Sequence, residues 1–202
     1  MKPVATDDVG DAVLDAARVA FNSRGYARTT MRGVAAAAGV APSVMRKYYD
    51  NKEQMFAAAM RLPFDPSRAV PELLSPGLDG MGERLVRGTF DVLKDDESRQ
   101  QIVDLFQAGA AAGRAAQALR EFLEESVIDR LAAAVGIPDA RMRSALISSH
   151  LVGLAATRFV IRLEPLASAP EDDVVRMYAP LIQDLLDPTK PLPGQRSSRS
   201  GG

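Results

Sequence analysis

Apolar residues recur at helical spacing along most of the chain, and no stretch alternates apolar and polar residues as a half-buried strand does. The first pattern runs from about residue 7 to residue 24, with Val13 and Phe21 on its apolar face. Thr6 is suited to cap this helix, and Gly25 stands where a left-handed residue can end it. The spacing of apolar residues therefore predicts an all-α protein.

Two short helices are predicted behind the first one. Thr30 is suited to cap a helix over 31–38, and Pro42 favours the first turn of a helix over about 42–48. The turn between them, residues 39–41, reads Gly-Val-Ala. Two helices joined by a Gly-containing turn of three or four residues form a helix-turn-helix, so we expect a three-helix domain of this kind at the N-terminus.

Four prolines interrupt the helical pattern between residues 63 and 79, which predicts a Pro-rich linker with about one turn of helix. Further helices are predicted at about 51–62, 80–94, 97–110, 114–135, 138–163 and 171–187. We therefore expect a helix-turn-helix domain with a connecting helix at 1–62, the linker at 63–79, a larger helical domain at 80–187 and a disordered tail at 188–202.

Composition excludes several kinds of chemistry. The chain of 202 residues has no Cys and one His, His150, which argues against disulfides, thiolate chemistry, a zinc site or a Ser-His triad. We expect no metal and no cofactor, and an all-α enzyme has few residues to work with. No window approaches about 18 unbroken apolar residues, and the first residues lack a signal-peptide apolar region. We expect a soluble, cytoplasmic protein without a membrane span.

Positive charge is concentrated in one part of a nearly neutral chain. The net charge is −1, yet residues 16–61 hold eight Lys or Arg and two Asp or Glu, a balance of +6. A basic segment on a neutral protein is typical of a protein that binds a polyanion. The alternative is a set of basic residues that are merely solvated.

The helix-turn-helix supplies candidate DNA contacts. The first turns of the second helix meet base edges in the major groove, and residues at helix N-termini favour phosphate. Arg46 and Lys47 are suited to guanine, and Ser43 to either base type. The candidate DNA-binding residues are Thr30, Arg32, Pro42, Ser43, Val44, Arg46, Lys47, Tyr48 and Lys52.

The segment VLDAARVAFNSRGYARTTMRGVAAAAGVAPSVMRKYYDNKEQMF, within residues 12–56, resembles the DNA-binding domain of TetR-type (tetracycline-repressor) bacterial transcription regulators. The residues at the family's spacing are Phe21, Gly25, Tyr26, Thr30, Val34, Ala35, Ala38, Gly39, Val40, Tyr49, Lys52 and Glu53. The resemblance implies a homodimer that represses from a palindromic operator and is released by a small-molecule effector. The segment GLAATRFVIRLEPLASAP is similar to the C-terminal domain of an actinobacterial branch.

Three positions depart from the family's pattern. Ala41 stands where Ser or Thr is usual, so the second helix lacks a side-chain N-cap, and Pro42 partly offsets this loss by fixing its own φ. Gly33 replaces a frequent acid and removes the acceptor of a capping box. Arg46 replaces a frequent Tyr, so its role, phosphate or base contact, stays open. We expect Tyr49 to pack in the domain core.

The last two helices carry a candidate dimer interface. Small residues recur every fourth position on the helix over 138–163, and small residues let another helix approach closely. The resemblance implies that the last two helices of each subunit form a four-helix interface, the alternative being that these faces pack only within one subunit. The candidate residues are Ala145, Ser149, Val152, Gly153, Ala156, Val174, Tyr178, Leu181, Ile182 and Leu185.

A ligand pocket is expected between the helices of the second domain, mostly apolar with a few polar groups. The candidates are Phe90, Ile102, Leu105, Phe106, Phe122, Ser126, His150, Leu154 and Arg158, each of which is also suited to an ordinary core. We expect His150 to be hydrogen-bonded. A buried unpaired Arg is costly, so we expect Arg158 to pair with Glu164 or Glu125, the alternative being that it binds an anionic ligand. The competing interpretation of the chain is a helical small-molecule sensor or scaffold without specific DNA binding.

Overall fold

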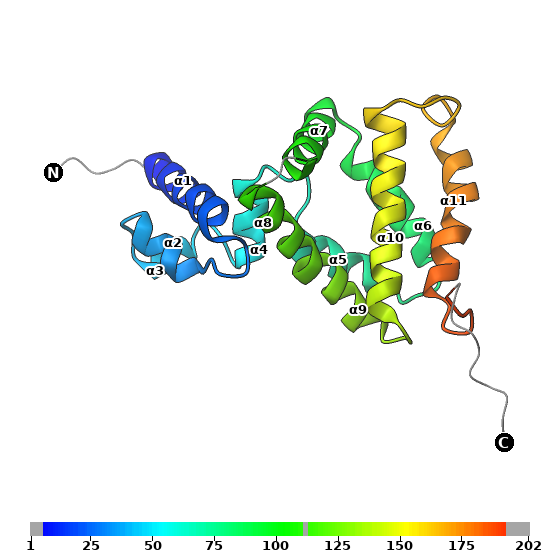
Figure 1. The fold of residues 1–202 in the computed structure, drawn as a ribbon, viewed down its shortest axis with the longest axis horizontal. Coiled ribbons are helices and arrows are strands. Elements are labelled where there is room, and N and C mark those ends of the chain that lie inside the picture. Colours follow the sequence, from blue (N-terminus) through cyan, green and yellow to red (C-terminus); the bar gives the residue numbers. More distant parts are fainter. Residues whose placement is uncertain (1–5, 111–112, 193–202) are drawn as a thin grey trace, which may run out of the picture. The chain divides into compact units, whose positions relative to one another are not determined.

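The computed structural model describes residues 6–110 and 113–192, and within them every regular element is a helix, which confirms the all-α fold (Figure 1). No helix of this described part has the length and apolar character that a membrane span requires. The elements are α1 (Thr6–Arg24), α2 (Met31–Ala37), α3 (Pro42–Met45), α4 (Lys52–Ala59), α5 (Pro66–Leu74), α6 (Met81–Val92), α7 (Asp96–Ala110), α8 (Arg114–Leu123), η1 (Glu124–Ile128), α9 (Asp129–Val135), α10 (Ala140–Ala155), η2 (Ala156–Val160) and α11 (Glu171–Leu186).

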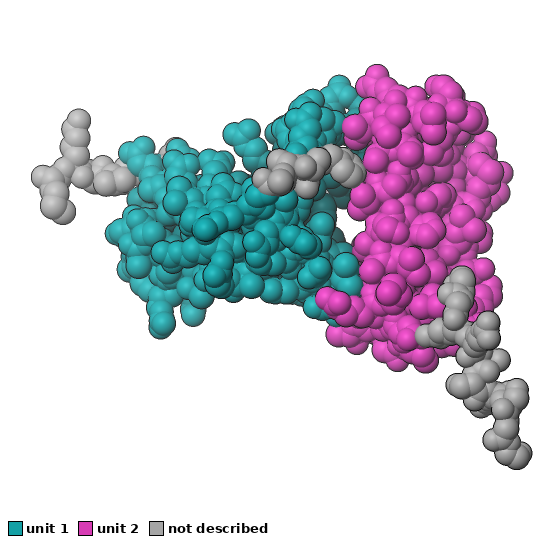
Figure 2. Space-filling view, viewed as in Figure 1, with its two compact units in different colours: residues 1–72, 91–130 teal, residues 73–90, 131–202 magenta. Residues whose placement is uncertain are grey.

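The chain folds into two compact units that are not continuous in sequence (Figure 2). Unit 1 holds the described residues of 1–72 and of 91–130, and unit 2 holds those of 73–90 and 131–202. The chain passes from unit 1 to unit 2 between residues 72 and 73, within the Pro-rich segment. Helices α7, α8 and η1, which the sequence analysis assigned to the second domain, share unit 1 with the helix-turn-helix. The predicted tail lies outside the described residues from 193 onward.

The core of unit 1 is built around four aromatic rings. Phe21, Tyr26, Phe56 and Phe122 are each at most 1% exposed. The Phe56 and Phe122 rings stack with centroids 4.4 Å apart, and Tyr26 meets both of them edge to face at 5.1 and 5.3 Å. Such pairs contribute about 0.5–1.5 kcal/mol beyond the burial of their area. Helix α8 is thus part of the same core as the helix-turn-helix.

Unit 2 packs α6, α9, α10 and α11 around a second apolar core. Helix α6 crosses α11 closely at Gly82, where an added Cβ would lie 2.4 Å from the Ala179 carbonyl oxygen. The Gln183 side chain closes this crossing, because its oxygen accepts from the Gly82 N–H at 2.9 Å and its amide donates to the Leu78 carbonyl at 3.0 Å. Only a residue without a side chain fits there.

The Pro-rich segment contains more helix than its prolines suggest. Helix α5 has nine residues with Pro71 inside it, although about one turn was expected. Asp65 precedes the helix and accepts from both the backbone N–H and the hydroxyl of Ser67, at 2.9 and 2.7 Å. This cap, together with buried Pro66 and Val70, offsets the hydrogen bond that Pro71 cannot donate.

The two long helices predicted in the second half each contain a π-helical turn. The predicted helix over 114–135 is α8, η1 and α9 in succession, and the Asp129 N–H donates to the Glu124 carbonyl, five residues back. The predicted helix over 138–163 is α10 followed by η2. A π-turn accommodates one extra residue, and such turns occur often at functional sites.

Replacing Gly82 by Ala should lower the free energy of unfolding by about 1–3 kcal/mol or more, because the new methyl group meets the rigid backbone of α11. Gly88 on the same helix is the matched control. A Cβ there meets only Leu73 Cδ2, at 3.5 Å, so Gly88→Ala should be neutral or stabilising by up to about 1 kcal/mol. Chemical denaturation of both variants checks this, and equal stabilities would contradict the close crossing.

Candidate nucleic-acid interface

Helices α2 and α3 are joined by a turn that glycine makes possible. Gly39 has φ +69°, the left-handed conformation that a residue with a Cβ rarely adopts. The Val40 N–H donates to the Ala35 carbonyl at 2.9 Å, and the Gly39 N–H donates to the Ala36 carbonyl at 3.2 Å. These two bonds form a Schellman motif, which ends α2 and turns the chain toward α3.

The N-termini of the two helices are capped differently. The Thr30 hydroxyl accepts from the Gly33 N–H at 3.1 Å, as expected for an N-cap. Ala41 precedes α3 and makes no side-chain cap, while Pro42 occupies the first turn, which confirms the weak cap read from the sequence. Helix α3 is only four residues long, and the bonds from Lys47 and Tyr48 to Val44 and Met45 continue it as turns. Buried Met45 anchors this segment to the core.

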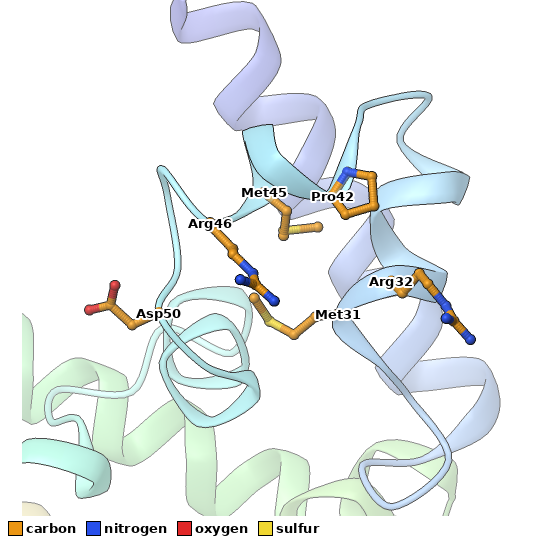
Figure 3. Close-up of a pocket in the computed structure, with 6 residues that line it drawn as sticks. All are labelled: Met31, Arg32, Pro42, Met45, Arg46 and Asp50. Carbon is orange, nitrogen blue, oxygen red and sulfur yellow. The ribbon is translucent and has the colours of Figure 1, made fainter.

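Three cations on this helix pair make no side-chain hydrogen bond or ion pair within the described residues: Arg32 on α2, and Arg46 and Lys47 at the end of α3. All three are exposed. Arg32 and Arg46 line a hollow of about 390 Å³. Figure 3 shows the Arg46 side chain extending toward Met31, while the Asp50 carboxylate points away from it. Cations without an internal partner are available to phosphates or base edges. The residues that line the hollow are Met31, Arg32, Pro42, Met45, Arg46 and Asp50.

The remaining candidates on α3 are placed by packing against α1 and the core. Pro42 and Ser43 are exposed, and Val44 is half-buried. The Tyr48 ring lies against α1, since a Cβ at Gly10 would stand 3.3 Å from its Cε1 atom. Tyr49 packs against the unit 1 core as expected, and burial raises the pKa of its hydroxyl.

Comparisons with known proteins agree with this geometry. The family model "Bacterial regulatory proteins, tetR family" matches residues 13–59, and the model "Tetracyclin repressor-like, C-terminal domain" matches residues 79–186. A TetR-family regulator from Streptomyces coelicolor A3 is 34% identical over 92% of this chain and 99% of that chain, with a TM-score of 0.46. The chain belongs to the TetR family. It is a DNA-binding transcriptional regulator.

Two further solved structures are similar to the chain at lower identity. NalD, the secondary repressor of the MexAB-OprM multidrug efflux pump in Pseudomonas aeruginosa, is 16% identical over 89% of this chain and 95% of that chain, with a TM-score of 0.49. A transcriptional regulator from Rhodococcus sp. Rha1 is 21% identical over 94% of this chain and all of that chain, with a TM-score of 0.46. No curated protein matches the chain significantly.

Lys52 has partners that the sequence did not suggest. In this TetR-family regulator its ammonium group lies 3.9 Å from the centroid of the Tyr26 ring, donates to the Tyr26 carbonyl at 3.3 Å and pairs with Glu125 at 3.8 Å. Lys52 is therefore held by Tyr26 and Glu125, whereas Arg32, Arg46 and Lys47 have no such partners among the described residues.

The candidate ligand residues are divided between the two units. Ile102, Leu105, Phe122 and Ser126 belong to unit 1, and Phe90, His150, Leu154 and Arg158 belong to unit 2. The Phe106 side chain lies outside the described residues. Phe122 and Ser126 take the core role that the sequence analysis gave as the alternative to a pocket wall. Phe122 is fully buried among aromatic rings, and Ser126 Oγ lies 3.2 Å from the Tyr26 hydroxyl, so both are core residues of the helix-turn-helix unit.

The two polar candidates of unit 2 are both hydrogen-bonded. Arg158 does not pair with Glu164 or Glu125. Its guanidinium donates instead to the carbonyls of Leu166 and Ala169 and lies 5.2 Å from the centroid of the Phe90 ring. Backbone carbonyls of the loop that follows η2 thus accept the hydrogen bonds that a carboxylate was expected to accept. His150 Nδ1 lies 2.8 Å from the Leu146 carbonyl oxygen, in line with the expected hydrogen bond.

Helices α10 and α11 run side by side and leave an apolar face uncovered within the subunit (Figure 1). Val152 and Leu181 are 47% and 52% exposed, and the small residues Ser149 and Gly153 are exposed beside Val152. Ala145, Ala156, Tyr178 and Leu185 are half-buried. Val174 and Ile182 do not belong to this face, because they are at most 2% exposed in the core of their own subunit. Met142 and Met177, which the sequence analysis missed, are 59% and 67% exposed on the same two helices.

The Tyr26 hydroxyl makes the stability of unit 1 sensitive to alkaline pH. Burial raises its pKa to about 12, an effect that the Ser126 hydrogen bond partly opposes and the nearby Glu53 carboxylate reinforces. Because the unfolded chain loses this proton near pH 10, the stabilisation is complete below pH 10 and is lost as pH rises toward 12. We expect the free energy of unfolding to fall by about 1 kcal/mol per pH unit in this window.

The Tyr26→Phe variant isolates this contribution. It should be about 1–2 kcal/mol less stable than the native chain at pH 7, because the Ser126 hydroxyl loses its partner. Between pH 10 and 12 the difference should shrink. Urea unfolding at a series of pH values measures both quantities, and parallel pH profiles would contradict the assignment.

Proposed function

We propose that this protein is a homodimeric repressor that binds a palindromic operator through the α2–α3 pair and leaves it when a small, largely apolar effector binds. The observation that supports it most strongly is a set of three exposed cations on a helix-turn-helix of the TetR family. Arg32, Arg46 and Lys47 have no side-chain partner in the part of the chain that the structure describes. A regulator of this kind acts in the cytoplasm, where its operator lies.

The cations divide by position into two kinds of contact. Arg46 and Lys47 follow directly on the second helix of the motif, so we assign them to base edges or the phosphates beside them. Arg32 and Thr30 lie at the start of α2, where phosphate contacts fix the register of the protein on the duplex. Pro42, Ser43 and Val44 form the first turn of α3, which approaches the bases. Lys52 would reach phosphate only by giving up its bond to Glu125.

Dimerisation supplies the symmetry that a palindrome requires. Half-sites are read when two recognition helices stand about 34–36 Å apart, one turn of the DNA helix. The uncovered face of α10 and α11, with Val152, Met177 and Leu181, is suited to pack against its copy. Gly153 supports this assignment, because a Cβ there would meet no atom within 4 Å from the described residues packed around its helix. An exposed helical Gly costs about 1 kcal/mol, so close approach of a second helix is a physical reason for it.

Release by an effector requires two states of different DNA affinity. An effector shifts the equilibrium only if it binds the DNA-incompetent state more tightly. The candidate residues that remain are Phe90, His150, Leu154 and Arg158 in unit 2 and, separately, Ile102 and Leu105 in unit 1. Their mostly apolar character favours an apolar effector with a polar group.

Removal of either cation at the end of α3 tests the DNA contact. Arg46→Ala and Lys47→Ala should each weaken binding to the operator by about 5- to 150-fold, the range of about 1–3 kcal/mol for one good base contact. Arg68→Ala, an exposed Arg on α5 outside the helix pair, removes the same charge and should change affinity by less than threefold. Fluorescence anisotropy with duplexes tiled across the DNA that flanks the gene measures all three at two salt concentrations.

Uniform weak binding of the native chain to every duplex, abolished by added salt, would contradict the proposal. It would favour a small-molecule sensor without specific DNA binding.

A charge on the uncovered α10–α11 face tests the dimer. Leu181→Glu should raise the dissociation constant of the dimer at least tenfold, because it places a carboxylate in an apolar contact with its copy. Val19→Glu is the matched control, since Val19 is 68% exposed on α1 in the other unit. Sedimentation equilibrium measures both. A dimer that Leu181→Glu leaves intact would assign the interface to another surface.

A further inference from the structure

An ion pair ties the start of α4 to the helix formed by α8, η1 and α9. One guanidinium nitrogen of Arg130 lies 2.5 and 2.6 Å from the two carboxylate oxygens of Glu53. The Glu53 side chain is 17% exposed and that of Arg130 is 35% exposed, so water screens this pair less than a surface pair. Arg130 lies far outside residues 13–59, the part that matches the DNA-binding family model.

Two further contacts join the same helix to the helix-turn-helix domain and the start of α4. Lys52, the neighbour of Glu53, pairs with Glu125, and the hydroxyls of Tyr26 and Ser126 lie 3.2 Å apart in the core. We call these three contacts, Glu53–Arg130, Lys52–Glu125 and Tyr26–Ser126, the η1 contact set. Its partners on one side all belong to the helix-turn-helix domain and the start of α4. Its partners on the other side all lie in the π-turn η1 or within two residues of its end.

The π-turn explains why Arg130 faces Glu53. Phe122 and Ser126 both contact Tyr26, so they mark the side of the helix that faces the helix-turn-helix. In an uninterrupted α-helix a residue seven positions after Phe122 would deviate from this side by about 20°, and one eight positions after by about 80°. Asp129 would then stand where Arg130 stands. The extra residue in η1 instead brings Arg130 to this side, so a cation meets the Glu53 carboxylate in place of an acid.

The start of α4 is in turn fixed to the end of the DNA-contacting segment. The Gln54 N–H donates to the Asn51 side chain at 2.7 Å, and the Gln54 side chain accepts from the Asp50 N–H at 2.7 Å. Only four residues separate Lys47 from Lys52. A change in the position of Lys52 and Glu53 is therefore transmitted to Arg46 and Lys47 through a short, hydrogen-bonded turn.

We propose that Arg130 is a positioning residue for DNA binding. Through Glu53 it holds the start of α4 in the orientation in which α2 and α3 meet the operator, without touching DNA itself. This inference rests on the DNA binding proposed above. It deepens that proposal by assigning the orientation of the helix-turn-helix to contacts at the π-turn. Breaking the pair should lower specific affinity, since the operator must then select the competent orientation from several.

Four variants of the full chain separate positioning from stability and from direct contact. Arg130→Gln and Glu53→Gln each break the pair, and the exchange E53R/R130E restores it with reversed charges. Arg120→Gln is the matched control, because Arg120 is exposed on α8 and loses the same charge. Operator affinity, affinity for nonspecific DNA as a function of salt, and the thermal midpoint are measured for each. Hydrogen exchange of residues 26–29 and 50–56 is measured without DNA.

The expected result is a loss of operator affinity of about tenfold in Arg130→Gln and Glu53→Gln, within the usual range of coupling between sites. The exchanged pair should recover most of it, and Arg120→Gln should change it by less than threefold. Exchange of residues 26–29 and 50–56 should rise in the two broken variants alone. The nonspecific salt slope should stay unchanged in Arg130→Gln, because Arg130 neutralises no phosphate.

Three results would overturn the proposal. A lower thermal midpoint with unchanged operator affinity would make the pair purely structural. A reduced nonspecific salt slope would make Arg130 a DNA contact. Unchanged hydrogen exchange in residues 26–29 and 50–56 would show that the ion pair does not orient the helix-turn-helix, whatever the native chain binds. If the native chain prefers no duplex, the proposed function fails. The hydrogen-exchange data still decide in that case whether Arg130 orients the helix-turn-helix.

Discussion

The packing of Phe122 against Tyr26 and Phe56 decides how the rest of unit 1 is organised. These three rings come from α8, from the segment after α1 and from α4, and each is at most 1% exposed. A domain of about 60 residues buries only about 60% of its surface and is marginal by itself. By adding Ala118 and Phe122 to its core, the helix-turn-helix gains apolar contacts from a helix that is some 60 residues away in sequence. The stability of the DNA-binding motif therefore depends on its packing against α8.

The local features of the DNA-binding motif were predictable from the sequence because each depends on neighbouring residues alone. Thr30 caps α2, Gly39 ends it with a positive φ, and Ala41 leaves α3 without a side-chain cap, all as the sequence indicates. Features that depend on distant partners were not predictable. Ser126 bonds to Tyr26, a hundred residues away, although its spacing also suits a pocket wall. Asp65 caps a nine-residue helix in the Pro-rich segment, where about one turn was expected.

The sequence also could not decide which residues are buried on a helix that is apolar on two sides. Val174, Leu181 and Ile182 all lie on α11, and spacing alone cannot tell which side its own subunit covers. The structure answers this, with Ile182 fully buried and Leu181 half exposed. Buried arginines add a second ambiguity. Arg143 is 3% exposed and donates to the carbonyls of Pro138, Leu185 and Asp187. Backbone carbonyls can therefore satisfy a buried Arg that has no carboxylate partner, and such an Arg need not bind a ligand. Arg158 follows the same rule.

Charge counted along the sequence overstates what is available to DNA. The balance of +6 across residues 16–61 includes Lys52, which pairs with Glu125, and Arg18, which pairs with Asp15 and donates to the Ala59 carbonyl. Arg32, Arg46 and Lys47 are left without such partners in the described structure. The two groups of cations have different consequences for binding. In the proposed mode of binding, the unpaired group contacts phosphates and bases, whereas Lys52 is held by Glu125 and acts through the position of the first group.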